Sequence, residues 1–255
     1  MTGPVEGGRE WLFISDIDDT LTGDDAALKR LSEVLARNRD RLWLVVNSSR
    51  PSGSVAETLI NVFPAGLTPD AVVTAMGTEI GVGGENLTVW QDRFDGWPQG
   101  RIFEILQDLG HTPHDEVYQT SWKVSFAVPV EAQAEAVAAL EGENLNCQII
   151  ASGTSDFDVL PVNAGKGEAT RFLAAHLGVA ADHVVASGDS GNDVELLKAA
   201  EHRIAVGNAR QELLDALPPV PFYHARAKHA AGVLEGLMHF GVVPAGGDQN
   251  GPVNG

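Results

Sequence analysis

The chain has 255 residues and a mass of 27.0 kDa, with 44% apolar and 20% charged residues, a composition typical of a folded globular protein and not of a disordered or collagen-like one. Because 35 acidic residues outnumber 17 basic ones, the formal net charge is −18, which excludes nucleic acids and anionic membranes as expected partners. The single cysteine, Cys147, the lack of a secretory leader, and the lack of any apolar run near the roughly 18 residues of a membrane span predict a cytoplasmic protein.

The first part of the chain alternates short apolar runs with segments of amphipathic periodicity. We expect strands over residues 11–17, 42–46 and 71–76, separated by helices near 25–38 and 52–62. This βαβαβ order predicts a parallel sheet that is covered by helices on both faces.

The pattern changes after Gly77, where strands come to outnumber helices. The expected elements are a hairpin around Gly81, Gly83 and Gly84, helices near 99–109 and 131–141, and strands at 123–128, 147–152 and 157–161. Strands that neighbour each other antiparallel in this way favour an α+β module inserted into the first fold. We place the inserted domain at residues 81–160 and the core domain at 1–80 and 161–255.

The α/β alternation resumes after the inserted domain. The expected elements are a helix after Lys166, strands at 183–189 and 204–207, and helices near 191–199 and 228–239. The terminal segments 1–10 and 244–255, rich in Gly, Pro and polar residues, receive no function. The predicted fold class is α/β, with a Rossmann-like parallel-sheet core domain and an inserted α+β domain.

Two carboxylates stand where the first strand ends. Asp16 and Asp18 share one side of an extended chain, and open parallel sheets bind ligands beyond the carboxyl ends of their strands. Such like charges repel unless a cation neutralises them or one keeps its proton, which suits a nucleophile beside a metal and a general acid/base. The alternative is helix capping, which we favour for Asp24 and Asp25. A calcium loop is excluded because Leu21 stands where that loop needs glycine.

A second acidic cluster follows the strand expected at 183–189. Asp189 and Asp193 offer carboxylate oxygens, and Asn192 offers an amide for orientation, a donor set that suits a hard cation such as Mg²⁺. Ser190 lies in a Gly-Asp-Ser-Gly string like that of a serine-protease nucleophile loop. The α/β pattern of this sequence does not match the fold of chymotrypsin-like serine proteases, so we interpret Ser190 as a turn residue.

Cationic and hydroxyl side chains occur where a bound phosphoryl group would need them. Lys166 opens a helix between two glycines, where an ammonium and free backbone N–H groups favour an anion. Ser48, Ser49 and Arg50 follow the second strand and offer donors to phosphoryl oxygens. Each feature alone has a common structural explanation, but all of them follow strands that end at one expected crevice.

In chain order, these residues resemble the four motifs of haloacid-dehalogenase superfamily phosphatases. The matches are D-x-D-x-T at 16–20, a hydroxyl at Ser48, the lysine Lys166 and G-D-x-x-N-D at 188–193. The inserted domain is similar to the type-II (Cof-like) cap of that superfamily. More narrowly, segments 16–24, 123–126, 158–167 and 222–240 resemble the sucrose-phosphate phosphatase family. One position departs from that family. The family usually carries Thr-Gly-Arg at the second motif, whereas here Ser49 stands in place of the glycine. This departure bears on the identity of the substrate.

The resemblance implies a role for each matching residue. Asp16 attacks phosphorus to form an aspartyl-phosphate, and Asp18 protonates the leaving sugar oxygen and then activates water. The implied ligands of Mg²⁺ are Asp16, the backbone carbonyl of Asp18 and Asp189, with Asp193 either as a further ligand or as a residue that supports the ligands. The implied phosphate-binding residues are Ser48 and Lys166, with Thr20, Ser49, Arg50 and Asn192 in support.

The substrate implied by the resemblance is a phosphorylated sugar, in the first place a disaccharide phosphate such as sucrose 6-phosphate. The alternatives are mannosylfructose phosphate, a glycosyl-glycerate or glycosyl-glycerol phosphate, a hexose-phosphate phosphotransferase, and a non-catalytic sugar-phosphate-binding module. An association with a glycosyltransferase that forms the phosphorylated sugar is a further expectation. Within the inserted domain, Trp122 and Lys123 are candidates for contact with the sugar, although we interpret Trp122 as a core anchor rather than a sugar platform.

Overall fold

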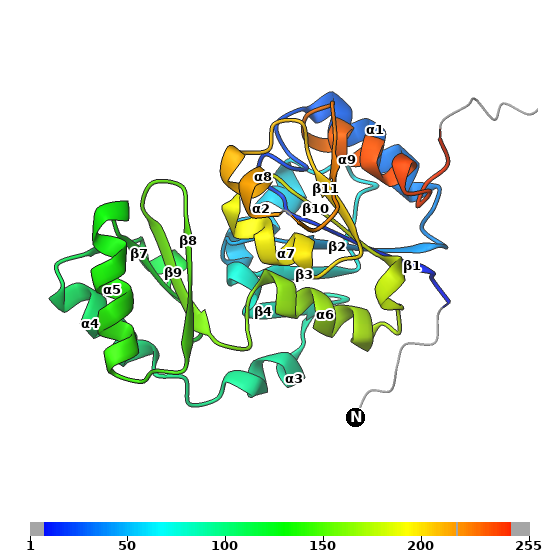
Figure 1. Cartoon of the computed structure of the whole chain (residues 1–255). Helices are drawn as coiled ribbons and strands as arrows, with labels where there is room; N and C mark the ends of the chain where they lie inside the picture. Colours follow the sequence, from blue (N-terminus) through cyan, green and yellow to red (C-terminus); the bar gives the residue numbers. More distant parts are fainter. Residues whose placement is uncertain (1–7, 218, 246–255) are drawn as a thin grey trace, which may run out of the picture.

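The computed structural model describes residues 8–217 and 219–245, so most of the two terminal segments lies outside the described residues. The strands of its larger sheet are β1 (Trp11–Ser15), β2 (Leu42–Asn47), β3 (Ala71–Thr74), β4 (Glu79–Val82), β5 (Glu85–Asn86), β10 (Val184–Gly188), β11 (His202–Ala205) and β12 (Tyr223–His224). They lie in the order β12-β11-β10-β1-β2-β3-β4-β5 (Figure 1).

Parallel pairing makes up most of the larger sheet. β1 lies between β2 and β10 and is parallel to both, and β3, β11 and β12 continue the parallel order outward. The hairpin β4–β5 adds an antiparallel edge beside β3. The parallel-sheet core of the predicted α/β class is confirmed.

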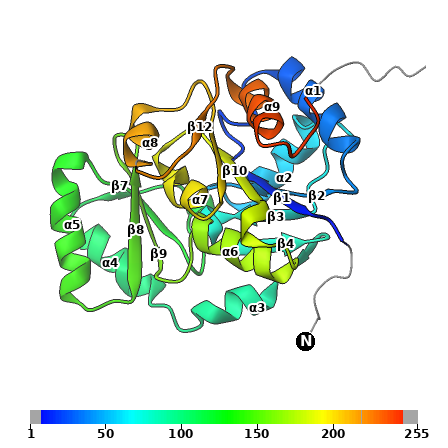
Figure 2. The same ribbon diagram turned by 45° about the vertical axis from the view of Figure 1, so that its right-hand side comes forward.

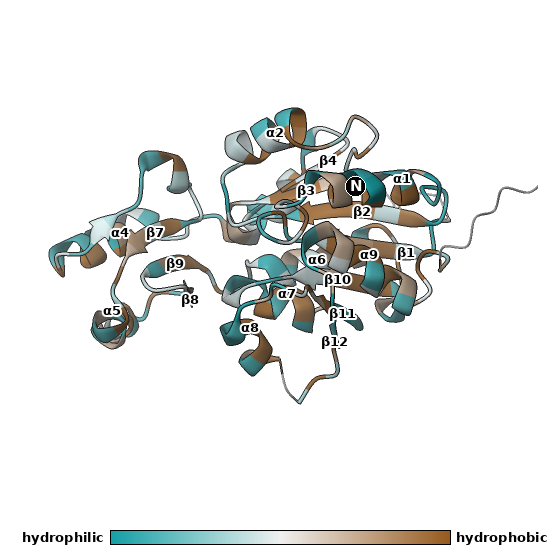
Figure 3. Cartoon of the chain, turned by 90° about the horizontal axis from the view of Figure 1, so that it is seen from above, coloured by the Kyte–Doolittle hydropathy of each residue, from teal (hydrophilic) through white to brown (hydrophobic). Residues whose placement is uncertain are grey.

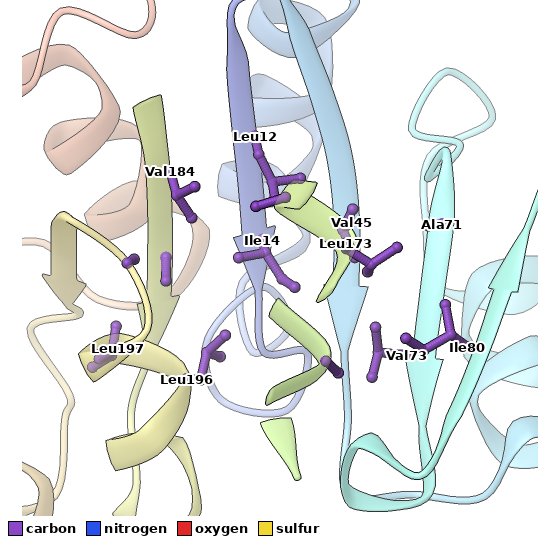
Figure 4. Packing of buried hydrophobic residues seen from close by; sticks show 14 of the residues in the cluster. Leu12, Ile14, Val45, Ala71, Val73, Ile80, Leu173, Val184, Leu196 and Leu197 are labelled. Atoms are coloured by element: carbon purple, nitrogen blue, oxygen red, sulfur yellow. The ribbon is translucent and has the colours of Figure 1, made fainter. Parts of the chain in front are cut away.

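Helices cover both faces of this sheet, as strands with continuous apolar runs require. They are α1 (Asp25–Ala36), α2 (Ser52–Asn61), α3 (Thr88–Gln91), α6 (Lys166–His176), α7 (Val194–Lys198), α8 (Gln211–Ala216) and α9 (His229–His239). Side chains alternate along β1, so Leu12 and Ile14 pack with α6 and α7 (Figure 4), while Phe13 packs with α1 and α9 on the other face. Figure 3 shows the strands of the larger sheet as mainly hydrophobic. Among the residues that the structure describes, no helix combines the length and the apolar character that a membrane crossing requires.

A second, smaller sheet lies to one side of the larger one and has its own apolar core (Figures 1 and 2). Its elements are α4 (Gln99–Asp108), β6 (Thr112–Pro113), β7 (Val124–Ala127), α5 (Val130–Gly142), β8 (Cys147–Ser152) and β9 (Asp156–Pro161). The strands pair antiparallel in the order β6-β7-β9-β8. Phe126 and Phe157 are fully buried in its core, beside Leu106 and Leu140 of the two helices. This is the α+β module expected in the middle of the chain.

The hairpin β4–β5 and helix α3 belong to the larger sheet rather than to the smaller one. Trp90 and Phe94 pack into the core beneath the larger sheet, and the hairpin turns at Gly83 and Gly84, whose φ angles are +59° and +86°. The domain boundary expected near residue 81 therefore falls inside a hairpin of the larger sheet. The turn glycines indicate a hairpin but not the sheet that it joins.

The chain crosses between the two parts of the molecule twice. It leaves the larger part after Phe94 and returns through residues 162–165, between β9 and α6. Gln148 of β8 holds this return segment, because its side-chain N–H group donates to Pro161 O at 2.9 Å and to Ala164 O at 2.6 Å.

Candidate active site

The predicted site residues lie at the carboxyl ends of three neighbouring strands of the larger sheet. Asp16 follows β1, Ser48 follows β2 and Asp189 follows β10, and the parallel register aligns the ends of these strands. Lys166 joins them from the start of α6. The structure thus brings together residues that are up to about 170 positions apart in sequence.

The ammonium of Lys166 is at the centre of this cluster. Its Nζ atom donates to Asp16 Oδ1 at 2.7 Å, to Asp193 Oδ1 at 2.6 Å and to Asn192 Oδ1 at 3.2 Å. The side chain is 1% exposed. Burial lowers the pKa of Lys166, but the charges of Asp16 and Asp193 outweigh burial and raise it above its usual value. The ammonium therefore stays charged in the interior.

Close backbone contacts fix the start of α6, from which Lys166 projects. Gly165 has a φ of +106°, which favours glycine, and a Cβ on Gly77 would collide with the Gly165 backbone. The side-chain amide of Asn47 donates to the Lys166 carbonyl at 3.1 Å. These contacts explain why glycine precedes the lysine and why the position of the lysine relative to β2 is defined.

Asp193 uses both of its carboxylate oxygens within the protein. Oδ1 accepts from Lys166, and Oδ2 accepts from the backbone N–H groups of Asp189 at 3.0 Å and Ser190 at 3.2 Å. Ser190 and Asp193 form a reciprocal capping box at the 3-10 turn Gly191–Asp193. Ser190 is a turn residue here, and Asp193 shapes the loop while it holds the ammonium.

Three buried carboxylates lie close enough to share one metal ion. Asp16, Asp189 and Asp193 each offer an oxygen, and these oxygens all lie within 4.8 Å of one another. With the Lys166 ammonium among them, three negative charges and one positive charge leave two negative charges to be neutralised. Carboxylate oxygens suit hard divalent ions, so the residues present fit a divalent metal ion.

The pKa values of the clustered acids are those of crowded, buried groups. Burial raises the pKa of Asp16 well above its usual range, and the charge of Asp193 adds to the rise while Lys166 opposes it. Burial and Asp193 likewise raise the pKa of Asp189 to about 6, although Thr20 Oγ1 donates to Asp189 Oδ1 at 3.1 Å and favours its charged form. A cation bound among these groups would lower both values.

Asp18 lies apart from the buried cluster and is open to solvent. Its side chain is 55% exposed and forms an ion pair with Arg50, in which Nε and Oδ2 are 2.9 Å apart. Arg50 Nη1 donates to Ser54 and Thr58 of α2, so the guanidinium is held in place. Its Nη2 atom is buried and has no hydrogen-bond partner among the described residues.

Ser48 is fully buried where β2 ends. Its Oγ accepts a hydrogen bond from the backbone N–H of Arg50 at 3.1 Å, and its own backbone N–H donates to Val73 O at 2.9 Å. The Ser48 hydroxyl can still donate its hydrogen. Ser49, in contrast, is half-buried and borders an open cavity.

A cavity of about 500 Å³ lies between the larger and the smaller part of the molecule. Ser49, Arg50 and Asn192 line it from the larger part, and His114, Lys123 and Asp158 are among the residues that line it from the smaller part. Its volume is within the range of about 300–1,000 Å³ found for small-molecule sites. Because Asn192 also contacts Lys166, the cavity adjoins the buried cluster.

A buried ion pair of the smaller part borders this cavity. Lys123 Nζ lies 3.1 Å from Asp158 Oδ1 and donates to the carbonyl of Ser49 at 3.2 Å. Ser125 Oγ donates to Asp158 Oδ1 at 2.5 Å and lies 2.9 Å from His114 Nδ1. Lys123 thereby connects the smaller part to the loop that follows β2.

Of the cavity residues of the smaller part, the sequence offered Lys123 as a candidate for contact with the sugar, but it assigned no role to His114, Ser125 or Asp158. Trp122, interpreted as a core anchor, packs against the core of the larger part. The signal that marks Lys123 and Ser125 is their alternation with Val124 and Phe126, which point into the core of the smaller sheet. That alternation identifies a polar face of the smaller sheet, but it does not predict that this face borders the cavity and the loop after β2.

Comparison of the sequence with known proteins gives matches along nearly the whole chain. The family model described as sucrose-6F-phosphate phosphohydrolase matches residues 9–241. The mannosylfructose-phosphate phosphatase of Agrobacterium fabrum is 33% identical over 245 residues, which cover 91% of this chain and 98% of that protein. Sucrose-phosphatase 1 of Nicotiana tabacum is 31% identical over 254 residues, which cover 91% of this chain and 60% of the tobacco protein. The match thus spans about three fifths of the plant relative.

A solved structure shares both parts of the fold. It is that of the sucrose-phosphatase from Synechocystis sp. in complex with sucrose and phosphate, with a TM-score of 0.85 at 30% identity. The match covers 93% of this chain and 100% of that chain. The combination of a larger parallel sheet and a smaller inserted sheet therefore extends over the full length of that relative.

Proposed function

The chain belongs to the sucrose-6F-phosphate phosphohydrolase family, and from this premise we propose that it hydrolyses a phosphorylated disaccharide with the help of Mg²⁺. The family resemblance and the class of phosphoric monoester hydrolase, both predicted from the motifs, are confirmed. The observation that carries the proposed substrate is the cavity of about 500 Å³ that adjoins the cluster around Lys166. A phosphoryl group at the cluster would leave the sugar in this cavity.

Asp16 is the proposed nucleophile, and Asp18 is the proposed general acid and base. The Asp16 carboxylate attacks phosphorus, the bond to the sugar oxygen breaks, and Asp18 gives that oxygen its proton. Asp18 then takes a proton from the water that hydrolyses the aspartyl-phosphate and releases inorganic phosphate. The ion pair with Arg50 holds Asp18 beside the cavity while its exposure lets water reach it.

Lys166, Ser48 and Arg50 are the proposed donors to the phosphoryl oxygens. Lys166 is charged and held next to Asp16 Oδ1, and Arg50 has an unpartnered N–H group at Nη2. Fixed donors of this kind stabilise the charge that a transferring phosphoryl group carries, which supplies much of the acceleration in phosphoryl transfer.

Asp16, Asp189 and the backbone carbonyl of Asp18 are the groups that we propose to hold Mg²⁺. Of the two roles expected for Asp193, a further ligand or a support for the ligands, we propose the support, because both of its oxygens are already engaged. When bound, Mg²⁺ supplies positive charge that neutralises the carboxylates and draws charge from the phosphoryl group. Thr20 and Asn192 orient Asp189 and Lys166 through the hydrogen bonds given above.

The smaller part is proposed to be a type-II cap that binds the sugar. We draw its limits at residues 95–161, because residues 79–86 pair within the larger sheet and Phe94 packs beneath it. Lys123, Asp158 and His114 offer both donors and acceptors to sugar hydroxyls. A cytoplasmic location and an association with a sugar-phosphate-forming glycosyltransferase stay predictions from the sequence.

A phosphate-release assay tests this function directly. Sucrose 6-phosphate and mannosylfructose phosphate are compared with hexose 6-phosphates, in Mg²⁺ and in chelator, with Asp16→Asn as the matched inactive control. We expect metal-dependent release from a disaccharide phosphate, without any added acceptor. Faster release from hexose phosphates would overturn the substrate class. Binding without release would favour the non-catalytic module, and transfer that requires a sugar acceptor would favour the phosphotransferase.

A further inference from the structure

The carbonyl oxygen of Asp19 receives two hydrogen bonds from distant parts of the chain. The side-chain amide of Asn208, in the loop after β11, donates through Nδ2 at 2.7 Å. The Nδ1 atom of His229, the first residue of α9, lies 2.9 Å from the same carbonyl oxygen. Because a carbonyl can only accept, Nδ1 of His229 carries the proton in this contact.

These three residues form a closed set of contacts. Asn208 Oδ1 accepts a hydrogen bond from the backbone N–H of His229 at 2.8 Å, so both the nitrogen and the oxygen of the Asn208 side-chain amide are hydrogen-bonded. Asp19 has a φ of +56° and His229 a φ of +50°, conformations that cost free energy in a residue other than glycine. A Cβ on Gly23 would lie 2.6 Å from the His229 ring, which shows how closely this ring packs on the loop after β1.

The same segment is also bonded to the second acidic loop. The backbone N–H of Arg210 donates to the carbonyl of Asp189 at 2.7 Å. Residues 208–210 therefore hold a carbonyl of the loop that carries Asp16 and Asp18, and a carbonyl of the loop that begins at Asp189. This arrangement sets the separation of the two acidic loops from outside the cavity.

We propose that Asn208 and His229 are positioning residues that fix the loop carrying Asp16 and Asp18 in its reactive geometry. The proposal rests on the proposed phosphatase function. Neither side chain lines the cavity or contacts Lys166, so both act through the carbonyl of Asp19. A displacement of about 1 Å at reacting groups costs up to about 100-fold in rate, and loss of a residue that orients a site residue costs about 10- to 100-fold.

The test compares variants that keep or remove the donor to the Asp19 carbonyl. His229→Asn places an amide N–H near the position of Nδ1, and asparagine tolerates positive φ, whereas His229→Ala and Asn208→Ala remove a donor. His239→Gln, at the other end of α9, is the matched control. We measure kcat and KM for phosphate release, the melting temperature, and hydrogen exchange of the backbone amides of residues 17–23.

We expect kcat to fall about 10- to 100-fold in His229→Ala and Asn208→Ala, with KM changed by less than about 3-fold because the cavity is untouched. His229→Asn should return kcat to within about 3-fold of the wild type, and His239→Gln should match the wild type. Unchanged kcat in both alanine variants would overturn the proposal, as would a His229→Asn variant as slow as His229→Ala at equal melting temperature.

Hydrogen exchange separates this proposal from the proposed function. If the wild type releases no phosphate from any substrate, the phosphatase function fails, but exchange at residues 17–23 still reports on the loop. Faster exchange in His229→Ala and wild-type exchange in His229→Asn would support positioning of the loop. Equal exchange in all variants would overturn it.

Discussion

Replacing Lys166 by methionine removes the charge at the centre of the buried cluster and keeps most of the side-chain volume. The ammonium is 1% exposed and lies 2.7 Å from Asp16 and 2.6 Å from Asp193, so the variant leaves two carboxylates buried without their cation. Removing one partner of a buried ion pair costs about 3–5 kcal/mol. At about 2–4 °C per kcal/mol for a chain of this size, we expect the melting temperature in chelator to fall by about 6–20 °C.

The same variant should also be a poor catalyst. Loss of one fixed donor to a transition-state oxygen typically costs about 10²–10³ in kcat, so phosphate release by Lys166→Met should fall by at least about 100-fold. This loss has a different cause from the loss of stability, because it depends on the phosphoryl oxygens rather than on the buried carboxylates.

The double variant Lys166→Met/Asp193→Asn separates the two effects. Asparagine keeps the shape of Asp193 and removes one unpaired charge, so the double variant should melt above Lys166→Met while its phosphate release stays low. Thermal unfolding by circular dichroism in chelator, beside a phosphate assay in Mg²⁺, measures both. If Lys166→Met melts within about 2 °C of the wild type, the ammonium does not balance buried charge. If the double variant regains turnover, Lys166 acts only by balancing charge.

Three further changes test the remaining groups. Asp16→Asn should abolish phosphate release because an amide is a poor nucleophile, and turnover above a few per cent of the wild type, with deamidation excluded by mass spectrometry, would refute its role. Asp189 has a folded-state pKa of about 6, above its unfolded value of 3.8, so its protonation stabilises the metal-free protein below pH 3.8 and this contribution is lost as the pH rises through 6. The melting temperature of the wild type relative to Asp189→Asn, in chelator, should therefore fall between about pH 4 and pH 6, and a constant difference would contradict the shift. Lys123→Met should raise KM for a disaccharide phosphate by about 10-fold or more, from the loss of a charged hydrogen bond. It should impair hydrolysis of a small phosphomonoester to a lesser extent, because Lys123 also holds the Ser49 carbonyl; equal losses for both substrates would count against a sugar-binding role.

The part of the site at the strand ends was predictable because the chemistry there is local. Asp16 and Asp189 each follow an apolar run that periodicity identifies as a buried strand, and parallel strands bring their carboxyl ends to one edge of the sheet. Lys166 could be placed with them because a helix follows it. The relative order of these segments along the chain then sufficed to predict one crevice.

The contacts that depend on which surfaces meet were beyond prediction from the sequence. Lys123, just before β7, pairs with Asp158 of β9, and the register of these antiparallel strands is set by tertiary packing. The hairpin β4–β5 has clear turn glycines, yet only the observed sheet tells which strand it joins. The helix α8 and the strand β12 have 6 and 2 residues, too few for periodicity to appear. Asn208 lies outside the family-like segments, and His229 lies in segment 222–240 without a role that the sequence could assign. Their hydrogen bonds to Asp19 join chain segments that are far apart in sequence.

The return segment 162–165 has a mechanical consequence for the whole molecule. A tether of four residues can span at most about 14 Å. The Gln148 side chain donates to two of its carbonyls, those of Val162 and Ala164, and the tether ends at Lys166, a proposed phosphate-binding residue. A displacement of the smaller part on this side would therefore pull directly on Lys166 and on the carboxylates that its ammonium contacts.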